Sequence, residues 1–152
     1  MARSYNKAKG RSKGQFISIP HHVLKSDMGK SLSGLEMLLL IHLLLQFNGR
    51  NNGNLTPAYS LMKECGWTST GSLYKARQGL EHKGFIVVTK QGRKIKGDCT
   101  LVAITWNGID DPIKWLYDEK VNVSPVPLNY FLKAKEDWSI QPVSKHPQSS
   151  RY

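Results

Sequence analysis

The stretch LTPAYSLMKECGWTSTGSLYKARQGLEHKGFI, residues 55–86, decides the fold that the sequence predicts. Thr56 suits the N-cap of a helix, and Pro57 suits its first helical position. Gly66 is a typical residue just beyond the end of a helix, because it tolerates a positive φ. A short helix is therefore expected over residues 57–65.

A second helix is expected over residues 69–83. Its apolar residues recur at i, i+3 and i+7, which places them in one stripe on one helical face: Leu73, Ala76 and Leu80. Gly84 ends this helix. The turn between the two helices, residues 65–68, contains Gly66 and lets the helices cross steeply, so that the second helix projects outward.

A longer helix is expected upstream, over residues 34–47. Ser33 and Glu36 have the S-x-x-E spacing of a capping box, in which each side chain bonds a free backbone amide. The residues of this helix are apolar around almost its whole circumference, so it is predicted to be the most buried element. Residues 48–54 end it in a tight polar loop.

Two β-rich segments follow the second helix of the decisive stretch. Residues 85–89 and 99–106 are rich in β-branched and aromatic side chains, and the segment between them is polar, with two glycines. This pattern predicts a β-hairpin with a long tip, residues 90–97.

The order of helix, short helix, turn, helix and hairpin resembles the winged helix-turn-helix DNA-binding proteins of bacterial phages and plasmids, which include replication initiators and repressors. The matching segments are Leu55-Thr56-Pro57, Gly66-Trp67-Thr68, Leu80-Glu81-x-x-Gly84-Phe85-Ile86 and Thr105-Trp106. The resemblance covers about residues 33–106. It implies an α+β fold with a three-helix core and a C-terminal β-hairpin wing, and it implies DNA binding as a class.

The 152 residues suit one compact domain with tails. We expect a disordered basic arm over residues 1–14 and the winged helix-turn-helix domain over 15–106. A C-terminal extension over 107–138 contains a short helix that starts at Asp110-Asp111-Pro112 and runs through Tyr117. Residues 139–152 are predicted to form a flexible, disordered tail.

The aromatic part of the extension, residues 128–138, has two interpretations. Tyr130, Phe131 and Trp138 could pack in cis to complete a small core, or they could form a homodimer or bind a partner. The sequence leaves both open.

The charge balance indicates the kind of partner. The chain has 22 Lys and Arg against 11 Asp and Glu, a net charge of +11, and such a field concentrates polyanions. No apolar run approaches the roughly 20 residues that cross a bilayer, and no apolar region of a secretory signal follows the basic N-terminus. A cytoplasmic protein with reduced Cys65 and Cys99 and no membrane partner is expected.

The outer face of the helix over 69–83 carries residue types that read DNA grooves. Arg can bridge O6 and N7 of guanine, Gln can bridge N6 and N7 of adenine, and hydroxyl groups suit base edges or phosphates. The predicted DNA-binding residues on this helix are Ser69, Thr70, Ser72, Tyr74, Lys75, Arg77 and Gln78.

The predicted wing tip adds four cations in eight residues. They are Lys90, Arg93, Lys94 and Lys96, and between Thr70 and Gly97 seven Lys or Arg face one acid, Glu81. Like charges placed so closely favour contact with phosphates. Arg50 in the polar loop, and Arg11 and Lys13 in the arm, are further predicted DNA contacts.

No catalytic, metal-binding or cofactor-binding site is expected. The five histidines lack the spacing of metal ligands, and no phosphate-binding glycine-rich loop or nucleophile motif occurs. His42 is interpreted as a hydrogen-bonded core or boundary side chain.

The sequence therefore predicts a non-enzymatic protein that binds double-stranded DNA in transcription regulation or replication initiation. The alternative is a basic accessory module of a mobile element that docks on a host protein or ribonucleoprotein complex.

Overall fold

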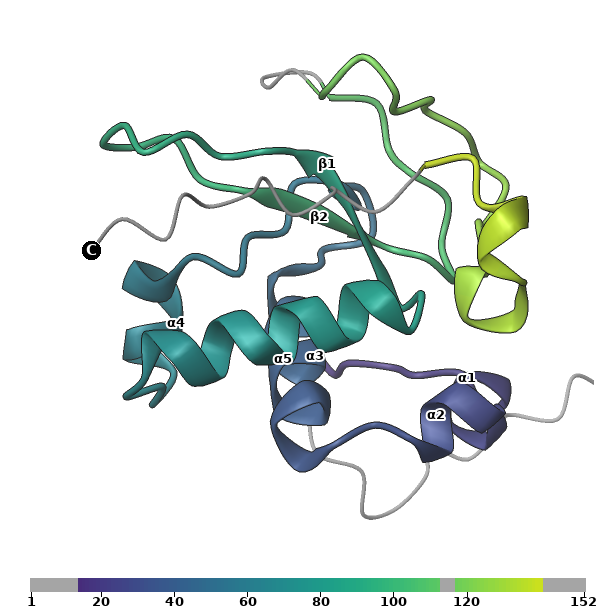
Figure 1. Ribbon diagram of the computed structural model, residues 1–152, viewed down its shortest axis with the longest axis horizontal. Helices are drawn as coiled ribbons and strands as arrows, with labels where there is room; N and C mark the ends of the chain where they lie inside the picture. The colour runs from purple at the N-terminus through teal and green to yellow at the C-terminus, as the bar shows by residue number, and fades with distance from the viewer. Residues whose placement is uncertain (1–13, 113–116, 141–152) are drawn as a thin grey trace, which may run out of the picture.

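The computed structural model describes residues 14–112 and 117–140 and is an α+β structure (Figure 1). Its described residues form five α-helices, a two-stranded antiparallel sheet and two short 3-10 helices. The elements are α1 (His21–Lys25), α2 (Asp27–Lys30), α3 (Gly34–Gln46), α4 (Tyr59–Glu64), α5 (Thr70–His82), β1 (Ile86–Lys90), β2 (Leu101–Ile104), η1 (Tyr130–Leu132) and η2 (Lys135–Asp137).

The predicted capping box at the start of α3 is confirmed. The Ser33 hydroxyl accepts a hydrogen bond from the Glu36 amide at 3.2 Å, and the Glu36 carboxylate accepts one from the Ser33 amide at 2.9 Å. Four leucines of α3 are buried in the core: Leu39, Leu40, Leu43 and Leu44.

The expectation that α3 is the most buried element was wrong. Leu35, Leu38 and Leu45 are 48%, 40% and 64% exposed. The turn of the helix places these three side chains on one face, opposite the four buried leucines. The described residues thus cover one side of α3, where α5 packs, and leave the other side open.

Helix α4 starts two residues later than predicted. The Thr56 hydroxyl accepts a hydrogen bond from the Ala58 amide at 3.2 Å and donates one to the Thr100 carbonyl at 3.0 Å. This second bond holds Thr56 beside the segment that enters β2, so the N-cap of α4 is Ala58. Gly66, with a φ of +98°, follows the helix as predicted.

Helix α5 agrees with its prediction within one residue at each end. Ser69 is its N-cap, and the Ser69 hydroxyl accepts a hydrogen bond from the Ser72 amide at 3.2 Å. The predicted stripe of Leu73, Ala76 and Leu80 is buried. In this way α5 is packed on α3 by one face and presents its other face outward (Figure 1).

The predicted hairpin is formed by β1 and β2, which pair Ile86 with Ile104 and Val88 with Val102. The register shifts between Val88 and Lys90. Leu55, in the segment before α4, forms an isolated antiparallel bridge with Val102, so this segment borders the hairpin on the side of β2.

Residues 128–138 pack in cis on the hairpin, which resolves the alternative for their packing. Phe131 stacks on Phe85 with ring centroids 5.2 Å apart, and Tyr130 stacks on Trp138 at 4.8 Å. Tyr130 and Trp138 also share a buried cluster with Val87 and Ala103, the residues on the second face of the hairpin. Both faces of the sheet are therefore covered.

The predicted short helix from Asp110-Asp111-Pro112 through Tyr117 falls mostly outside the described residues, which omit 113–116. Asp110, Asp111 and Pro112 themselves are not helical, and the Asp110 carboxylate accepts a hydrogen bond from the Asn52 backbone amide at 2.8 Å. The tail predicted from residue 139 begins two residues too early, since the Ser139 hydroxyl hydrogen-bonds the Tyr130 hydroxyl at 2.6 Å. Ile140 is buried, and its amide donates to the Tyr130 hydroxyl at 2.8 Å.

The loop after α3 contains a fully buried amide, that of Asn52. Its Oδ1 accepts a hydrogen bond from the Ile104 amide at 2.7 Å, and its Nδ2 donates to the carbonyls of Ile104 at 2.9 Å and Gly108 at 2.7 Å. Buried polar groups are costly unless they are hydrogen-bonded. The bonds of Asn52 satisfy its own side-chain amide and also the backbone groups at the end of β2. The loop is thereby fixed to the hairpin.

We predict that Asn52→Ala destabilises the fold by about 3 to 5 kcal/mol, because it leaves several buried backbone groups unpaired. Urea denaturation measures this loss. Asn54→Ala in the same loop is the control, and as an ordinary substitution it is expected to cost about 0.5 kcal/mol or less. Equal losses for the two variants would contradict the central role of Asn52.

Candidate nucleic-acid interface

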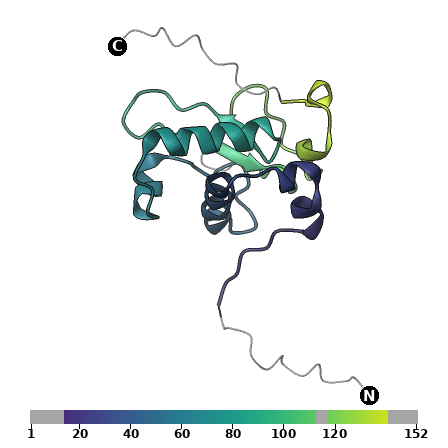
Figure 2. The same ribbon diagram turned by 60° about the horizontal axis from the view of Figure 1, so that its bottom comes forward.

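One end of the molecule brings together α4, the first turns of α5 and the loop between β1 and β2. Figures 1 and 2 show these three segments at the same end from two directions, while η1 and η2 lie at the other. The β1–β2 loop, residues 91–100, extends beyond the sheet toward the start of α5. Three segments from different parts of the sequence thus border a single surface.

A cleft of about 370 Å³ lies between these segments. Five of the predicted DNA-binding residues line it, from α5 and from the loop: Thr70, Tyr74, Arg77, Arg93 and Lys94. Its walls therefore carry hydroxyl, guanidinium and ammonium groups, the donors that contact phosphates in protein–DNA complexes.

On α5, three predicted residues contact one another. The Arg77 guanidinium lies over the Tyr74 ring, 5.2 Å from its centroid, and the Gln78 side-chain amide donates to the Tyr74 hydroxyl at 3.0 Å. Tyr74 is 50% exposed. The stacked ring restricts the guanidinium, which lowers the side-chain entropy that Arg77 would lose on binding any planar acceptor.

The loop carries an acid that organises two of its cations. The Asp98 carboxylate lies 2.8 Å from the Lys90 ammonium and 2.9 Å from Nε of Arg93, and it also accepts the Arg93 backbone amide. The hydrogen bond from Lys90, followed by those from Arg93, lowers the pKa of Asp98 well below its usual range.

The predicted run of four free wing-tip cations therefore needs correction. Lys90 and Arg93 are both paired with Asp98, whereas no ion pair joins Lys94 or Lys96 to another described residue. The charge count that ended at Gly97 missed an acid one residue further on. Two of the four cations are already partly neutralised within the loop.

Of the residues that the structure describes, the remaining predicted DNA-binding residues do not line this cleft. At the N-cap of α5 the Ser69 hydroxyl accepts the Ser72 backbone amide, and Lys75 is exposed on the same helix. Lys96 is exposed in the loop. Arg50 follows Asn48 and Gly49, which line a separate cleft, so the fold does not bring it to the α5 cleft. Arg11 and Lys13 lie outside the described residues.

Sequence reasoning did not identify several residues of this cleft. Besides Asp98, they include Tyr59 at the start of α4 and Thr100 before β2. The Thr100 hydroxyl accepts the Gly92 amide at 3.1 Å and so closes the base of the loop. The position of Tyr59, two residues after Pro57 and in the first turn of the short helix predicted there, is the signal that could have indicated it.

His42, at the boundary of the core, is hydrogen-bonded as predicted, because its Nδ1 accepts the Trp67 indole N–H at 2.9 Å.

Among residues 14–112 and 117–140, no three His, Cys, Asp or Glu side chains are placed to hold a metal ion. No helix in this part of the chain has the length and apolarity to span a membrane.

Comparisons with family models, with curated proteins and with solved structures gave no match. The interpretation of the site therefore depends on its own geometry and charge.

An ordinary aspartate has a pKa of about 3.9 and is protonated below that pH. We predict that Asp98 is still ionised when the pH falls below this value. Because its pKa is lowered in the fold, its stabilising contacts are complete above that ordinary value and are lost as the pH falls through the lowered one. The carboxyl-carbon NMR signal of Asp98 and the exchange protection of the Arg93 amide measure both changes. An Asp98 signal that titrates near the pKa of an ordinary aspartate would contradict the ion pairs of Asp98 with Lys90 and Arg93.

Proposed function

We propose that this protein binds double-stranded DNA as a winged helix-turn-helix, with α5 as the recognition helix and the β1–β2 loop as the wing. The order α3, α4, α5, β1, β2 and the bridge of Leu55 to Val102 support this assignment. Gly66, with its positive φ, makes the turn between α4 and α5. In this class of fold the second helix of the pair enters the major groove.

The observation that carries the proposal is the shared cleft. The outer face of α5 contributes Tyr74 and Arg77, and the loop contributes Arg93 and Lys94. A helix in the major groove has a phosphate backbone on each side, so a loop that stands beside its outer face is placed to contact one strand. Arg77 then faces base edges while Lys94 faces phosphates.

The charge of the chain supports the same assignment. A net charge of +11 attracts a polyanion over long distance; Lys94 lines the cleft, and Lys75 on α5 and Lys96 in the loop are further exposed cations of the same two elements. Asp98 limits this attraction at the loop, because its negative charge partly neutralises Lys90 and Arg93. The same ion pairs hold these two cations in defined positions. The proposed interface therefore combines fixed and free cations.

We propose transcription regulation or replication initiation as the role of this binding. The alternative role, a basic module that docks on a host protein or ribonucleoprotein complex, makes the same cleft a protein contact. The two are separated by variants of Arg77 and Lys94, as described below.

Affinity for duplex DNA is expected to fall steeply with salt, because binding releases counterions from neutralised phosphates. About six contacts at roughly 0.9 per contact correspond to a loss of about a thousandfold between about 50 and 200 mM salt. Fluorescence anisotropy at several salt concentrations measures the slope. A slope near zero is incompatible with the proposal.

Arg77→Ala and Lys94→Ala are expected to differ in kind. Loss of a bidentate base contact by Arg77 costs roughly 1 to 3 kcal/mol on a preferred site and relaxes the choice at one base pair, whereas loss of Lys94 weakens all duplexes alike. Binding is measured on a site selected from a random pool and on a scrambled duplex, at one salt concentration.

Lys25→Ala is the matched control, because this exposed cation on α1 lies outside the cleft. Thermal melting checks each fold, and surface changes of this kind are expected to alter stability by about 0.5 kcal/mol at most. Equal losses on both duplexes for Arg77→Ala would remove its base-reading role. No loss for either Arg77→Ala or Lys94→Ala would favour the docking alternative.

A further inference from the structure

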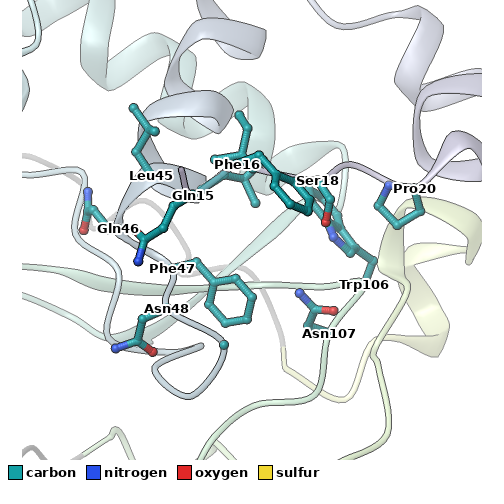
Figure 3. Close-up of a pocket in the computed structure, with 13 residues that line it drawn as sticks. Gln15, Phe16, Ser18, Pro20, Leu45, Gln46, Phe47, Asn48, Trp106 and Asn107 are labelled. Atoms are coloured by element: carbon teal, nitrogen blue, oxygen red, sulfur yellow. The ribbon is translucent and has the colours of Figure 1, made fainter. Parts of the chain in front are cut away.

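A second surface, separate from the α5 cleft, combines exposed apolar side chains with a hollow. Leu35, Leu38 and Leu45 form the open side of α3, and Phe16 stands beside Leu45 from the segment before α1. A cleft of about 590 Å³ lies at the C-terminal end of this side, where Phe16 and Leu45 line it (Figure 3). We call these four side chains and this cleft the α3 face.

The exposure of the α3 face is unusual for a monomer. Phe16 is 88% exposed, and Leu45 is 64% exposed. Figure 3 shows the side chains of Phe16, Phe47 and Trp106 around the same hollow, with the polar side chains of Asn48 and Asn107 near its edge. Contiguous apolar surface with a polar rim is typical of a protein interface.

The α3 face is also free of net charge in a strongly basic chain. No Lys, Arg, Asp or Glu lines the cleft, and the single charged residue of α3, Glu36, is paired with Lys83 at 2.7 Å. Two copies with a charge of +11 repel each other, and the repulsion is smallest where the surfaces that meet carry no cations. The side chains that line this cleft and the open side of α3 carry none.

We propose that the α3 face is the interface of a symmetric homodimer. A two-fold interface uses the same patch on both copies, so the patch must contain both a projection and a hollow. Phe16 and Leu45 project, and the cleft beside them is large enough to receive an aromatic side chain from the second copy. This places the interface on α3, since Tyr130, Phe131 and Trp138 of the C-terminal extension are buried in cis.

The available area fits a reversible dimer. The exposed parts of the four side chains and the cleft walls amount to roughly 500 Å² on each copy, or about 1,000 Å² in a pair, which is the lower range of specific interfaces. A dimer of this size is expected to dissociate at micromolar concentrations.

Analytical ultracentrifugation of the full chain without DNA tests the proposal. The wild-type chain is expected to shift from monomer to dimer as its concentration rises to about 100 µM. Phe16→Glu and Leu45→Glu are expected to remain monomeric with unchanged melting temperatures, because both side chains are exposed. Val126→Glu, a change of another exposed apolar residue outside the cleft, is the matched control and is expected to dimerise normally.

Salt distinguishes this association from DNA binding. Screening of the like charges of the two copies is expected to strengthen the dimer as salt rises, the opposite of the expected effect on the DNA complex.

A wild-type chain that stays monomeric over the whole concentration range would overturn the proposal. So would dimerisation that persists in both Phe16→Glu and Leu45→Glu. If the chain is monomeric and an apolar fluorescent dye binds it but not Leu45→Glu, the α3 face belongs to a different partner. Each of these results leaves the DNA-binding proposal unaffected.

Discussion

The Asn52 side chain enters the interior of the protein and bonds there to the backbone at the end of β2. The constraint is strict, because an amide withdrawn from water must have partners for both its donor and its acceptor. One side of the contact is the loop that leaves α3, and the other is the hairpin that carries the loop of the α5 cleft. This junction therefore ties the loop after the helix α3 to the hairpin whose connecting loop borders that cleft.

Sequence reasoning located the helices and the hairpin because their signals are local. The capping box of Ser33 and Glu36, the glycines after α4 and α5, and the apolar stripe of α5 each act within a few residues of the chain. The start of α4 shows the limit of such signals. Thr56 has the right identity for an N-cap, but its hydroxyl is drawn to Thr100, 44 positions away, and the helix begins later.

The contacts that join the helices, the loop after α3 and the hairpin could not be predicted from local sequence patterns, because the residues that make them lie far apart in the sequence. Asn52 bonds Ile104 across 52 positions, and in the sequence it is one of several asparagines in a polar loop. The covered second face of the hairpin had a signal, since Phe85-Ile86-Val87-Val88 is an uninterrupted apolar run rather than an alternating one, as in strands buried on both faces. At the site, the residue types on α5 were identified, but the pairing of Asp98 with Lys90 and Arg93 was not.

The packing of residues 128–140 on the hairpin also has a consequence for biosynthesis. Val87 and Ala103 are made before Tyr130, Trp138 and Ile140, which cover them and leave the ribosome last among the described residues. Until then the nascent chain presents the apolar face of a two-stranded sheet, which is a site for aggregation or chaperone binding. The order of synthesis therefore makes the C-terminal extension the step that completes folding.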